Sequence, residues 1–307
     1  MKPLVLAVAG FSWGGVLQAA ELDPAWVKLA TTPATLGWAT EGAGTTGGPA
    51  ASAEQVHVVT SRAELVAALG GDNATNGTND APALIFVDGE IDLTADDEGR
   101  PQGIAAFADP DYDEAAYIAA YDPEVYGREA EPEGPLEEAR RRSQQRQAAH
   151  GVIRVGSNKT LFGLPGATLR HGTLLLSDVE NVIIRNMAFE DSWDHFPQWD
   201  ATDGSQGNWN AEYDLVSIEN DTTNVWIDHS AFSDGDRFDD ALPPVFGRVK
   251  QHHDGLVDIK NGATFVSLTS NRFFDHDIRE ICDRLNATPR KCLGWRTPAE
   301  VFRAKML

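Results

Sequence analysis

Three aspartates are spaced so that they could bind one metal ion. Asp214 stands in AEYDLVSI, at the head of an expected strand, and Asp254 and Asp258 stand four residues apart in HHDGLVDIK. Residues i and i+4 of an extended strand point to the same face but lie about 13 Å apart. A pair that shares one ion must therefore span a bend, and Gly255 gives the chain a place for one.

Carboxylates without cysteine or a dedicated histidine suit a hard divalent cation, Ca²⁺ before Mg²⁺. The pattern therefore predicts Asp214, Asp254 and Asp258 as calcium ligands. On spacing alone, solvated surface aspartates explain it equally well. His252 and His253 suggest zinc, but adjacent strand residues face opposite ways, so one ion rarely takes both.

A second acidic group lies in a polar loop and comprises Asp194, Asp200 and Asp203. These side chains could bind sugar hydroxyl groups. Aspartates in loops more often accept hydrogen bonds from nearby backbone N–H groups. Loop stabilisation is therefore the favoured interpretation.

A repeat in the sequence would position the three aspartates. Asn181–Phe189, Asn224–Phe232 and Phe265–Phe273 align without gaps, at offsets of 43 and 41 residues. Such a period indicates a solenoid, and apolar residues at every second position indicate strands with one face inward. Few helices intervene, so we expect an all-β fold, an incomplete right-handed parallel β-helix with a few surface helices. An antiparallel sandwich is the alternative. Since Asp214 precedes Asp254 by 40 residues, stacked coils would bring the two together.

Before the repeats, the patterns predict shorter elements. We expect strands at 56–59, 83–87 and 89–93, and a helix from Ser61 to residue 69 with Glu64 closing a capping box. Residues 21–55 read as loop and 96–135 as an acidic surface insertion. A surface helix is expected over 135–147, with Glu137 and Glu138 paired to Arg141 and Arg142.

The composition limits the class of partner. The chain has 307 residues, with 25 Lys and Arg against 47 Asp and Glu, a formal net charge of −22. Such acidity argues against nucleic acid as a partner of the main body. It also repels acidic polymers unless a divalent cation bridges the two. Solubility alone is the simpler explanation of the charge.

The first twenty residues predict export. Lys2 is followed by an apolar run that ends in Ala19 and Ala20, as in a secretory signal peptide, so we expect a secreted protein. No other stretch suits a membrane span. The two cysteines, Cys282 and Cys292, both follow Asp277, so no disulfide framework supports the body before it.

Four longer phrases resemble the calcium-dependent pectate lyases: FPQWDATDGSQGNWNAEYD, NVWIDHSAFSDG, QHHDGLVDIKNGA and NRFFDHD. The resemblance runs from Val56 to Asp277. It implies a parallel β-helix, calcium held by Asp214, Asp254 and Asp258, and an acidic polysaccharide, polygalacturonate, as partner. Lys260 matches a position that in some members faces substrate carboxylates. Trp226 and Asp228 look structural, Trp226 for packing and Asp228 for hydrogen bonds in a turn.

The resemblance also implies a reaction. Pectate lyases cut polygalacturonate by β-elimination: the proton at C5 of a uronate is removed and the C4 glycosidic oxygen is expelled. Calcium between protein and substrate carboxylates stabilises the enolate-like state. An arginine acts as the base in this family.

The sequence departs from the family pattern after Asp277. Ile278 stands where a lysine is common, and the segment R-x-P-x-x-R that carries the catalytic arginine occurs nowhere in the chain. Residues 278–307 carry a net charge of +4 and resemble the C-terminus of an insertion-sequence transposase. We therefore expect a signal peptide at 1–20, a partial lyase domain at 21–277 and a short, helical foreign tail. A divergent terminus that caps the β-helix is the milder alternative.

Three functional hypotheses follow. The first is a truncated pectate lyase with little or no activity, whose exposed β-helix end leads to non-specific self-association. The second is a non-catalytic, calcium-dependent pectate-binding β-helix. The third, a DNA-related protein defined by its tail, is opposed by the charge of −26 on the preceding residues.

Overall fold

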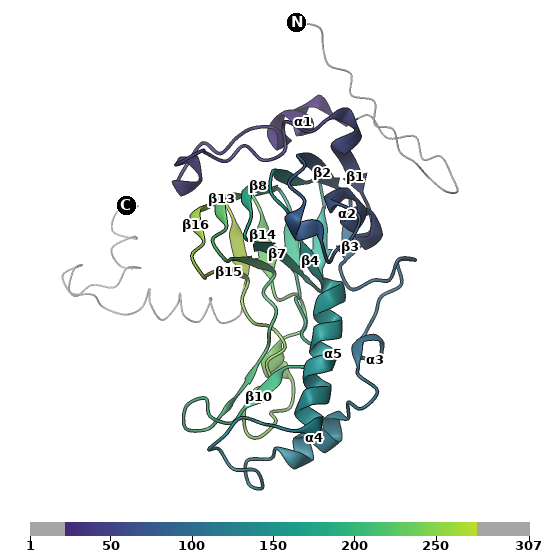
Figure 1. Cartoon of the computed structure of the whole chain (residues 1–307), viewed down its shortest axis with the longest axis vertical. Helices are drawn as coiled ribbons and strands as arrows, with labels where there is room; N and C mark the ends of the chain where they lie inside the picture. The colour runs from purple at the N-terminus through teal and green to yellow at the C-terminus, as the bar shows by residue number, and fades with distance from the viewer. Residues whose placement is uncertain (1–21, 275–307) are drawn as a thin grey trace, which may run out of the picture.

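The computed structural model describes residues 22–274. Three parallel sheets, here called walls A, B and C, form the body (Figure 1). Wall A contains β1 (Val56–Val59), β2 (Ala83–Val87), β5 (Lys159–Gly163), β8 (Glu180–Arg185), β13 (Thr223–Asp228) and β16 (Thr264–Thr269). Wall B contains β3 (Glu90–Asp92), β6 (Thr168–Arg170), β9 (Ala188–Glu190), β14 (Ala231–Ser233) and β17 (Arg272–Phe274). Wall C contains β4 (Val152–Arg154), β7 (Thr173–Ser177), β12 (Val216–Glu219) and β15 (Val257–Ile259).

The chain passes from wall to wall and returns one strand further along each sheet, so the fold is the predicted parallel β-helix. The repeat sets the register. Val182 pairs with Val225 and Val225 with Val266, while Phe189, Phe232 and Phe273 pair in the same way on wall B. The expectation that each repeat is a single strand is wrong, because a turn at each repeat's centre divides it between walls A and B.

Asparagine makes the turns of the repeat possible. Asn181 and Asn224, which begin two repeats, have φ of 62° and 55°, in the left-handed region that asparagine tolerates better than most residues. Phe265 occupies the same position in the third repeat with φ of 51°. A left-handed conformation is strained for a bulky residue, so the third repeat forms this turn at a higher cost than the first two.

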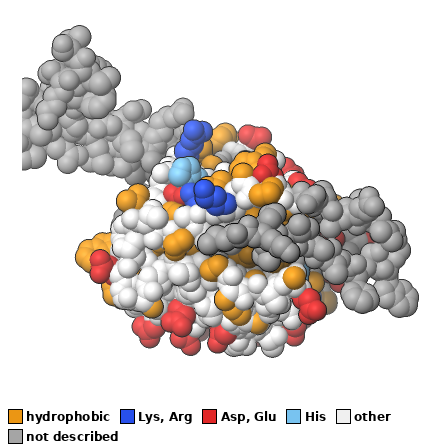
Figure 2. Space-filling view, turned by 90° about the horizontal axis from the view of Figure 1, so that it is seen from above, with side chains coloured by type: hydrophobic (Ala, Val, Ile, Leu, Met, Phe, Trp, Pro, Cys, Tyr) orange, Lys and Arg blue, Asp and Glu red, His pale blue; other side chains and the backbone are white. Residues whose placement is uncertain are grey.

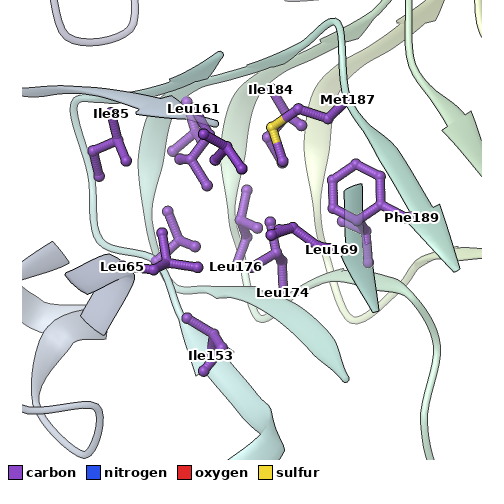
Figure 3. Close-up of a cluster of buried hydrophobic side chains, with 14 of the residues drawn as sticks. Leu65, Ile85, Ile153, Leu161, Leu169, Leu174, Leu176, Ile184, Met187 and Phe189 are labelled. Atoms are coloured by element: carbon purple, nitrogen blue, oxygen red, sulfur yellow. The ribbon is translucent and has the colours of Figure 1, made fainter. Parts of the chain in front are cut away.

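The interior of the coil is filled by aliphatic side chains from all three walls. Figure 3 shows Ile85, Leu161 and Ile184 from wall A above Leu174 and Leu176 from wall C, all of them members of one buried cluster. On wall B the rings of Phe189 and Phe232 stack at 5.0 Å and those of Phe232 and Phe273 at 5.1 Å. Each of these side chains faces inward because residues alternate across a strand, which leaves the intervening residues on the outer face.

The N-terminal segment is more ordered than expected. Within 21–55, which was predicted as loop, lie α1 (Pro24–Ala30) and the 3₁₀ turns η1 (Trp38–Thr40) and η2 (Ala53–Gln55). Asn181 accepts the backbone N–H of Gly47 at 2.8 Å, and Asn224 donates to the carbonyl of Glu41. The loop prediction is therefore wrong for α1. The local sequence pattern of this segment is weak, and its structure depends on tertiary contacts with wall A.

The other helices cover one end and one side of the coil. They are α2 (Arg62–Leu69), α3 (Ile104–Phe107), α4 (Glu114–Ala120) and α5 (Pro135–Gly151), with η3 (Asn76–Thr78) and η4 (Asp239–Ala241) between strands. The expected helices at 61–69 and 135–147 are confirmed, but the insertion at 96–135 contains α3 and α4.

Two local side-chain predictions are wrong in detail. Glu64 accepts from the backbone of Thr60, not of Ser61, so the capping box closes one residue early. Glu137 pairs with the buried Arg140, and Arg142 pairs with Asp109. The spacing of residues along the helix predicted the wrong partner for Arg142, because the carboxylate it binds belongs to Asp109 in the 96–135 insertion.

Long loops from wall B to wall C build a second layer below the coil (Figure 1). They carry the antiparallel pair β10 (Gln198–Asp200) and β11 (Asn208–Asn210). Trp199 and Trp209 are fully buried there against Tyr117 and Tyr121 of α4 and its C-cap. These loops end at Asp214 and Asp254, and so determine where both carboxylates enter wall C.

The acidic residues are dispersed. On the face in Figure 2, Asp and Glu side chains are spread around the edge and few Lys or Arg side chains are visible. Within residues 22–274, no helix is long and apolar enough to cross a bilayer. The predicted signal peptide, the DHD end of the lyase segment and the predicted foreign tail lie outside the described residues.

Candidate functional site

The three predicted aspartates lie together at one end of wall C. Asp214 comes two residues before β12, and Asp258 lies within the adjacent strand β15, where it pairs in register with Ser217. Asp254 precedes β15 by three residues, and the chain bends at Leu256. The predicted bend between Asp254 and Asp258 is therefore present, one residue after Gly255.

Asp214 is held in place by its neighbour on the next coil. Its Oδ1 accepts the backbone N–H of Gly255 at 3.0 Å, and its carbonyl accepts the hydroxyl of Thr173 at 2.6 Å. Its side chain is buried. A hydrogen-bonded carboxylate at the end of a packed strand is well fixed in direction, as a metal ligand needs to be.

The carboxylates repel one another. Burial, and then the charges of Asp254 and Asp258, raise the pKa of Asp214 to about 7. Partial desolvation, and then the charge of Asp258, raise the pKa of Asp254. The residue Asp254 is nevertheless exposed to solvent. Like charges near one another favour a bound cation, because the cation removes the repulsion between them.

Lys260 lies beside this group. Its Nζ donates to Asp258 at 2.7 Å, which raises the pKa of the lysine. Its charge also acts on Asp214 and Asp254 and lowers their pKa values against the effects above. The side chain remains 43 % exposed, so it can also meet an anionic ligand.

The oxygen atoms of the three carboxylates suit a hard cation, but the three side chains do not converge on a common point. Within the described part of the chain, no three His, Cys, Asp or Glu side chains are arranged closely enough to hold an ion. Asp258 instead turns to Lys260 and Asp214 to Gly255. The backbone thus brings three carboxylates to neighbouring positions at β12 and β15, without gathering their side chains around one point.

His252 and His253 lie immediately before the aspartates, in two different environments. The ring of His252 stacks on Trp193 at 4.1 Å. His253 bonds Asp191 with Nε2 and Asp239 with Nδ1, both at 3.0 Å, and these carboxylates raise the pKa of His253 to about 9 against the effect of burial. An imidazole with both nitrogens on carboxylates is a cation, not a metal ligand.

This Asp191–His253–Asp239 network was missed by sequence reasoning. Arg237 adds a bidentate pair to Asp191 at 2.8 Å and lies over the ring of Trp193. The four charged residues are separated by up to 62 residues, so no local pattern could reveal them. The network fixes the loop that delivers Asp254.

Two of the three acidic loop residues, Asp194 and Asp200, behave as the favoured interpretation expected. Asp194 is fully buried and accepts the backbone N–H of Phe196 at 2.7 Å and the amide of Gln144 at 2.8 Å. Asp200 accepts from the backbone N–H and the hydroxyl of Thr202. Both carboxylates stabilise the loops.

Comparison with known proteins agrees with this architecture. Residues 133–286 match the family model described as pectate lyase. The chain is 42 % identical over 278 residues to the pectate lyase of Bacillus subtilis (strain 168), which covers 90 % of this chain and 64 % of the relative.

Solved structures agree as well. A thermostable pectate lyase superposes with a TM-score of 0.76 at 46 % identity, covering 78 % of this chain and 61 % of the other. A pectate lyase bound to hexasaccharide superposes with a TM-score of 0.74 at 39 % identity, covering 83 % and 65 %. The chain spans less than two thirds of the length of each of these relatives. From the match over half of its residues and the shared β-helix, the chain belongs to the pectate lyase family.

Proposed function

We propose that this chain binds polygalacturonate through Ca²⁺ held by Asp214, Asp254 and Asp258, at a site built for β-elimination of the polymer. The observation that carries the proposal is the placement of three carboxylates at the paired strands β12 and β15, in wall C of a pectate lyase fold. A protein with a net charge of −22 needs a cation to hold an acidic polymer there.

Each residue has a distinct part. Asp214 is the ligand whose direction is fixed, because it accepts a hydrogen bond from Gly255. Asp254 and Asp258 come from the next coil. When bound, calcium neutralises these carboxylates and a uronate carboxylate together, which makes the uronate's C5 proton more acidic. Lys260, whose side chain is 43 % exposed beside this group, would bind a second uronate carboxylate.

The base of the reaction is not assigned. Among the described residues, the cation whose charge acts on both Asp214 and Asp254 is Lys260, and the resemblance gives Lys260 a substrate-binding role and not the role of the base. We propose low lyase turnover for this chain, because its sequence has no R-x-P-x-x-R segment. The same observation favours the second candidate, a calcium-dependent pectate-binding protein without catalysis.

The test uses the purified full chain, with and without Ca²⁺. Polygalacturonate binding is measured by titration calorimetry, and elimination by the ultraviolet absorbance of the unsaturated product. We expect calcium-dependent binding that Asp254→Ala removes, with little or no product. Ordinary lyase rates would show that another group serves as base. Binding that is unaffected by chelation or by Asp254→Ala would contradict the calcium site.

We also propose that the protein is secreted. Residues 1–20 have the charge and apolar run of a signal peptide, and a polymer of the plant cell wall is met outside the cell. Determination of the N-terminal residue of the exported protein would test this. A mature chain that retains Met1 would contradict cleavage.

A further inference from the structure

The loop that follows β9 contacts both of the chain segments that lead to Asp214 and Asp254. Asp194 lies in this loop, four residues after β9 ends, and is fully buried. One of its hydrogen bonds, with Phe196, stays inside its own loop, whereas others reach the two segments. The proposed calcium chemistry does not involve Asp194, so these longer contacts need another explanation.

The side chain of Asp194 holds the segment that leads to Asp214. Its Oδ2 accepts the backbone N–H of Glu212 at 3.1 Å. Glu212 precedes Asp214 by two residues, about 7 Å along an extended chain. Ser192, in the same loop as Asp194, adds a hydrogen bond of 2.8 Å from its hydroxyl to the carbonyl of Tyr213. The loop therefore fixes both residues that come directly before Asp214.

The backbone of Asp194 holds the segment that leads to Asp254 in the next coil. Its N–H donates to the carbonyl of His252 at 2.7 Å, and its carbonyl accepts from Nδ1 of His252 at 2.6 Å. His252 precedes Asp254 by two residues, as Glu212 precedes Asp214. A single residue thus holds the two segments at equivalent points, each two residues before an aspartate.

We infer that Asp194 is a positioning residue of the candidate calcium site, which sets the separation of Asp214 and Asp254 by holding both segments. The inference rests on the proposed function, because this separation matters for calcium only if the two aspartates are ligands. Residues that orient metal ligands without touching the metal typically change metal affinity by about 10–100-fold when they are replaced.

The contacts of Asp194 require a carboxylate. Oδ1 accepts the backbone N–H of Phe196 at 2.7 Å, and Oδ2 accepts from Gln144 of α5 at 2.8 Å as well as from Glu212. Asparagine has the same shape but offers one oxygen, and its amide nitrogen donates. In Asp194→Asn, at least one of the three donors therefore faces another donor, while the size of the side chain is kept.

The first measurement is made without calcium. The N–H of Gly255 donates to Asp214 across the two coils, so its hydrogen exchange reports whether the coils keep their relative position. In the presence of chelator, Asp194→Asn should speed exchange at Gly255 about tenfold, the effect of weakening one hydrogen bond to a charged group. Two-dimensional NMR of the full chain follows this amide.

The second measurement is calcium titration by calorimetry. Asp194→Asn should weaken calcium binding at least about tenfold. The luminescence lifetime of Tb³⁺, a substitute for Ca²⁺, counts the water molecules on the ion. Tb³⁺ should carry more water in the variant than in the wild type, because a displaced carboxylate leaves its coordination position to water.

Asp228→Asn is the matched control. Asp228 is also a buried aspartate, but it lies in wall A and binds Arg185 and Thr269. This change should lower the melting temperature without altering calcium affinity, the hydration of Tb³⁺ or exchange at Gly255. A general loss of stability would affect the two variants alike, whereas a positioning role affects only Asp194→Asn.

The outcomes separate this inference from the proposed function. Wild-type calcium affinity or wild-type exchange at Gly255 in folded Asp194→Asn overturns the inference and leaves the proposed function standing. A wild-type chain that binds no calcium overturns both. If Asp194→Asn does not fold, Ser192→Ala takes its place, since it removes only the hydroxyl bond to Tyr213. Calcium binding about threefold weaker supports the inference, and unchanged binding overturns it.

Discussion

The backbone N–H of Gly255 lies 3.0 Å from Oδ1 of Asp214, and this contact joins two successive coils at the candidate calcium site. A Cβ atom at Gly255 would lie 2.5 Å from the same oxygen, closer than real contacts allow. The glycine therefore does more than permit a bend, since it lets the next coil approach the carboxylate closely.

Gly255→Ala should weaken calcium binding about tenfold, because the added methyl group pushes Asp214 aside and removes a hydrogen bond that fixes a ligand. Calcium titration calorimetry gives the affinity. Gly103→Ala is the matched control, since Gly103 has a negative φ and open space around its Cβ position. Equal affinities in the two variants would show that Asp214 is not a ligand.

Asp214→Asn should stabilise the calcium-free protein while abolishing its response to calcium. Burial, and then repulsion from Asp254 and Asp258, raise the pKa of Asp214 to about 7, so at pH 8 its ionised form is held against both effects. Removing that charge should add about 1 kcal/mol, or ~2–4 °C in melting temperature. Melts with calcium and with chelator measure both effects, and a variant less stable than wild type in chelator would contradict the repulsion.

The stability of the body should fall as pH rises from about 6.5 to 9. The carboxylates of Asp191 and Asp239 raise the pKa of His253 from 6.5 to about 9. Such a group contributes its full stabilisation below pH 6.5 and loses it as pH rises through 9, a change on the order of 3 kcal/mol.

Urea denaturation at pH 6, 8 and 10, in the presence of chelator, measures this dependence. His253→Gln should be less stable than wild type at pH 6 and should show a flatter profile over the same range. His229→Gln changes a histidine that is 58 % exposed and should keep the wild-type profile. Parallel profiles for wild type and His253→Gln would exclude His253 as the source.

Self-association should occur through the coil that ends with β17. In residues 22–274, the outer edges of β15, β16 and β17 pair with no other strand. Ile259, Phe273 and Phe274 are exposed beside them, Phe274 by 56 %. Open backbone edges with apolar side chains favour pairing with another chain.

Light scattering after gel filtration should therefore show species larger than a monomer that grow with concentration. Phe274→Glu should reduce them. Val125→Glu, at a side chain that is 78 % exposed elsewhere, is the control and should not. A monodisperse monomer at all concentrations would contradict association through this edge.

Much of the fold could be predicted from the sequence, because each coil of the β-helix repeats the same pattern of apolar residues. The alignment of Val182 with Val225 and Val266 gave the register of wall A, since identical coils place identical positions side by side. Position 265 shows the limit of that reading. Nothing in the sequence signalled that Phe265 would take the left-handed turn that Asn181 and Asn224 form easily.

For the site, the sequence determined which residues could act as ligands. Asp214 and Asp254 are separated by about one repeat, and Gly255 lies between Asp254 and Asp258. Only the tertiary structure decided what surrounds them. The ion pair of His253 with Asp191 and the hydrogen bond from Gly255 to Asp214 both join residues from different coils. The local sequence pattern indicates the periodicity of one chain segment. Ion pairs and hydrogen bonds depend instead on residues from other segments, which only tertiary packing brings close together.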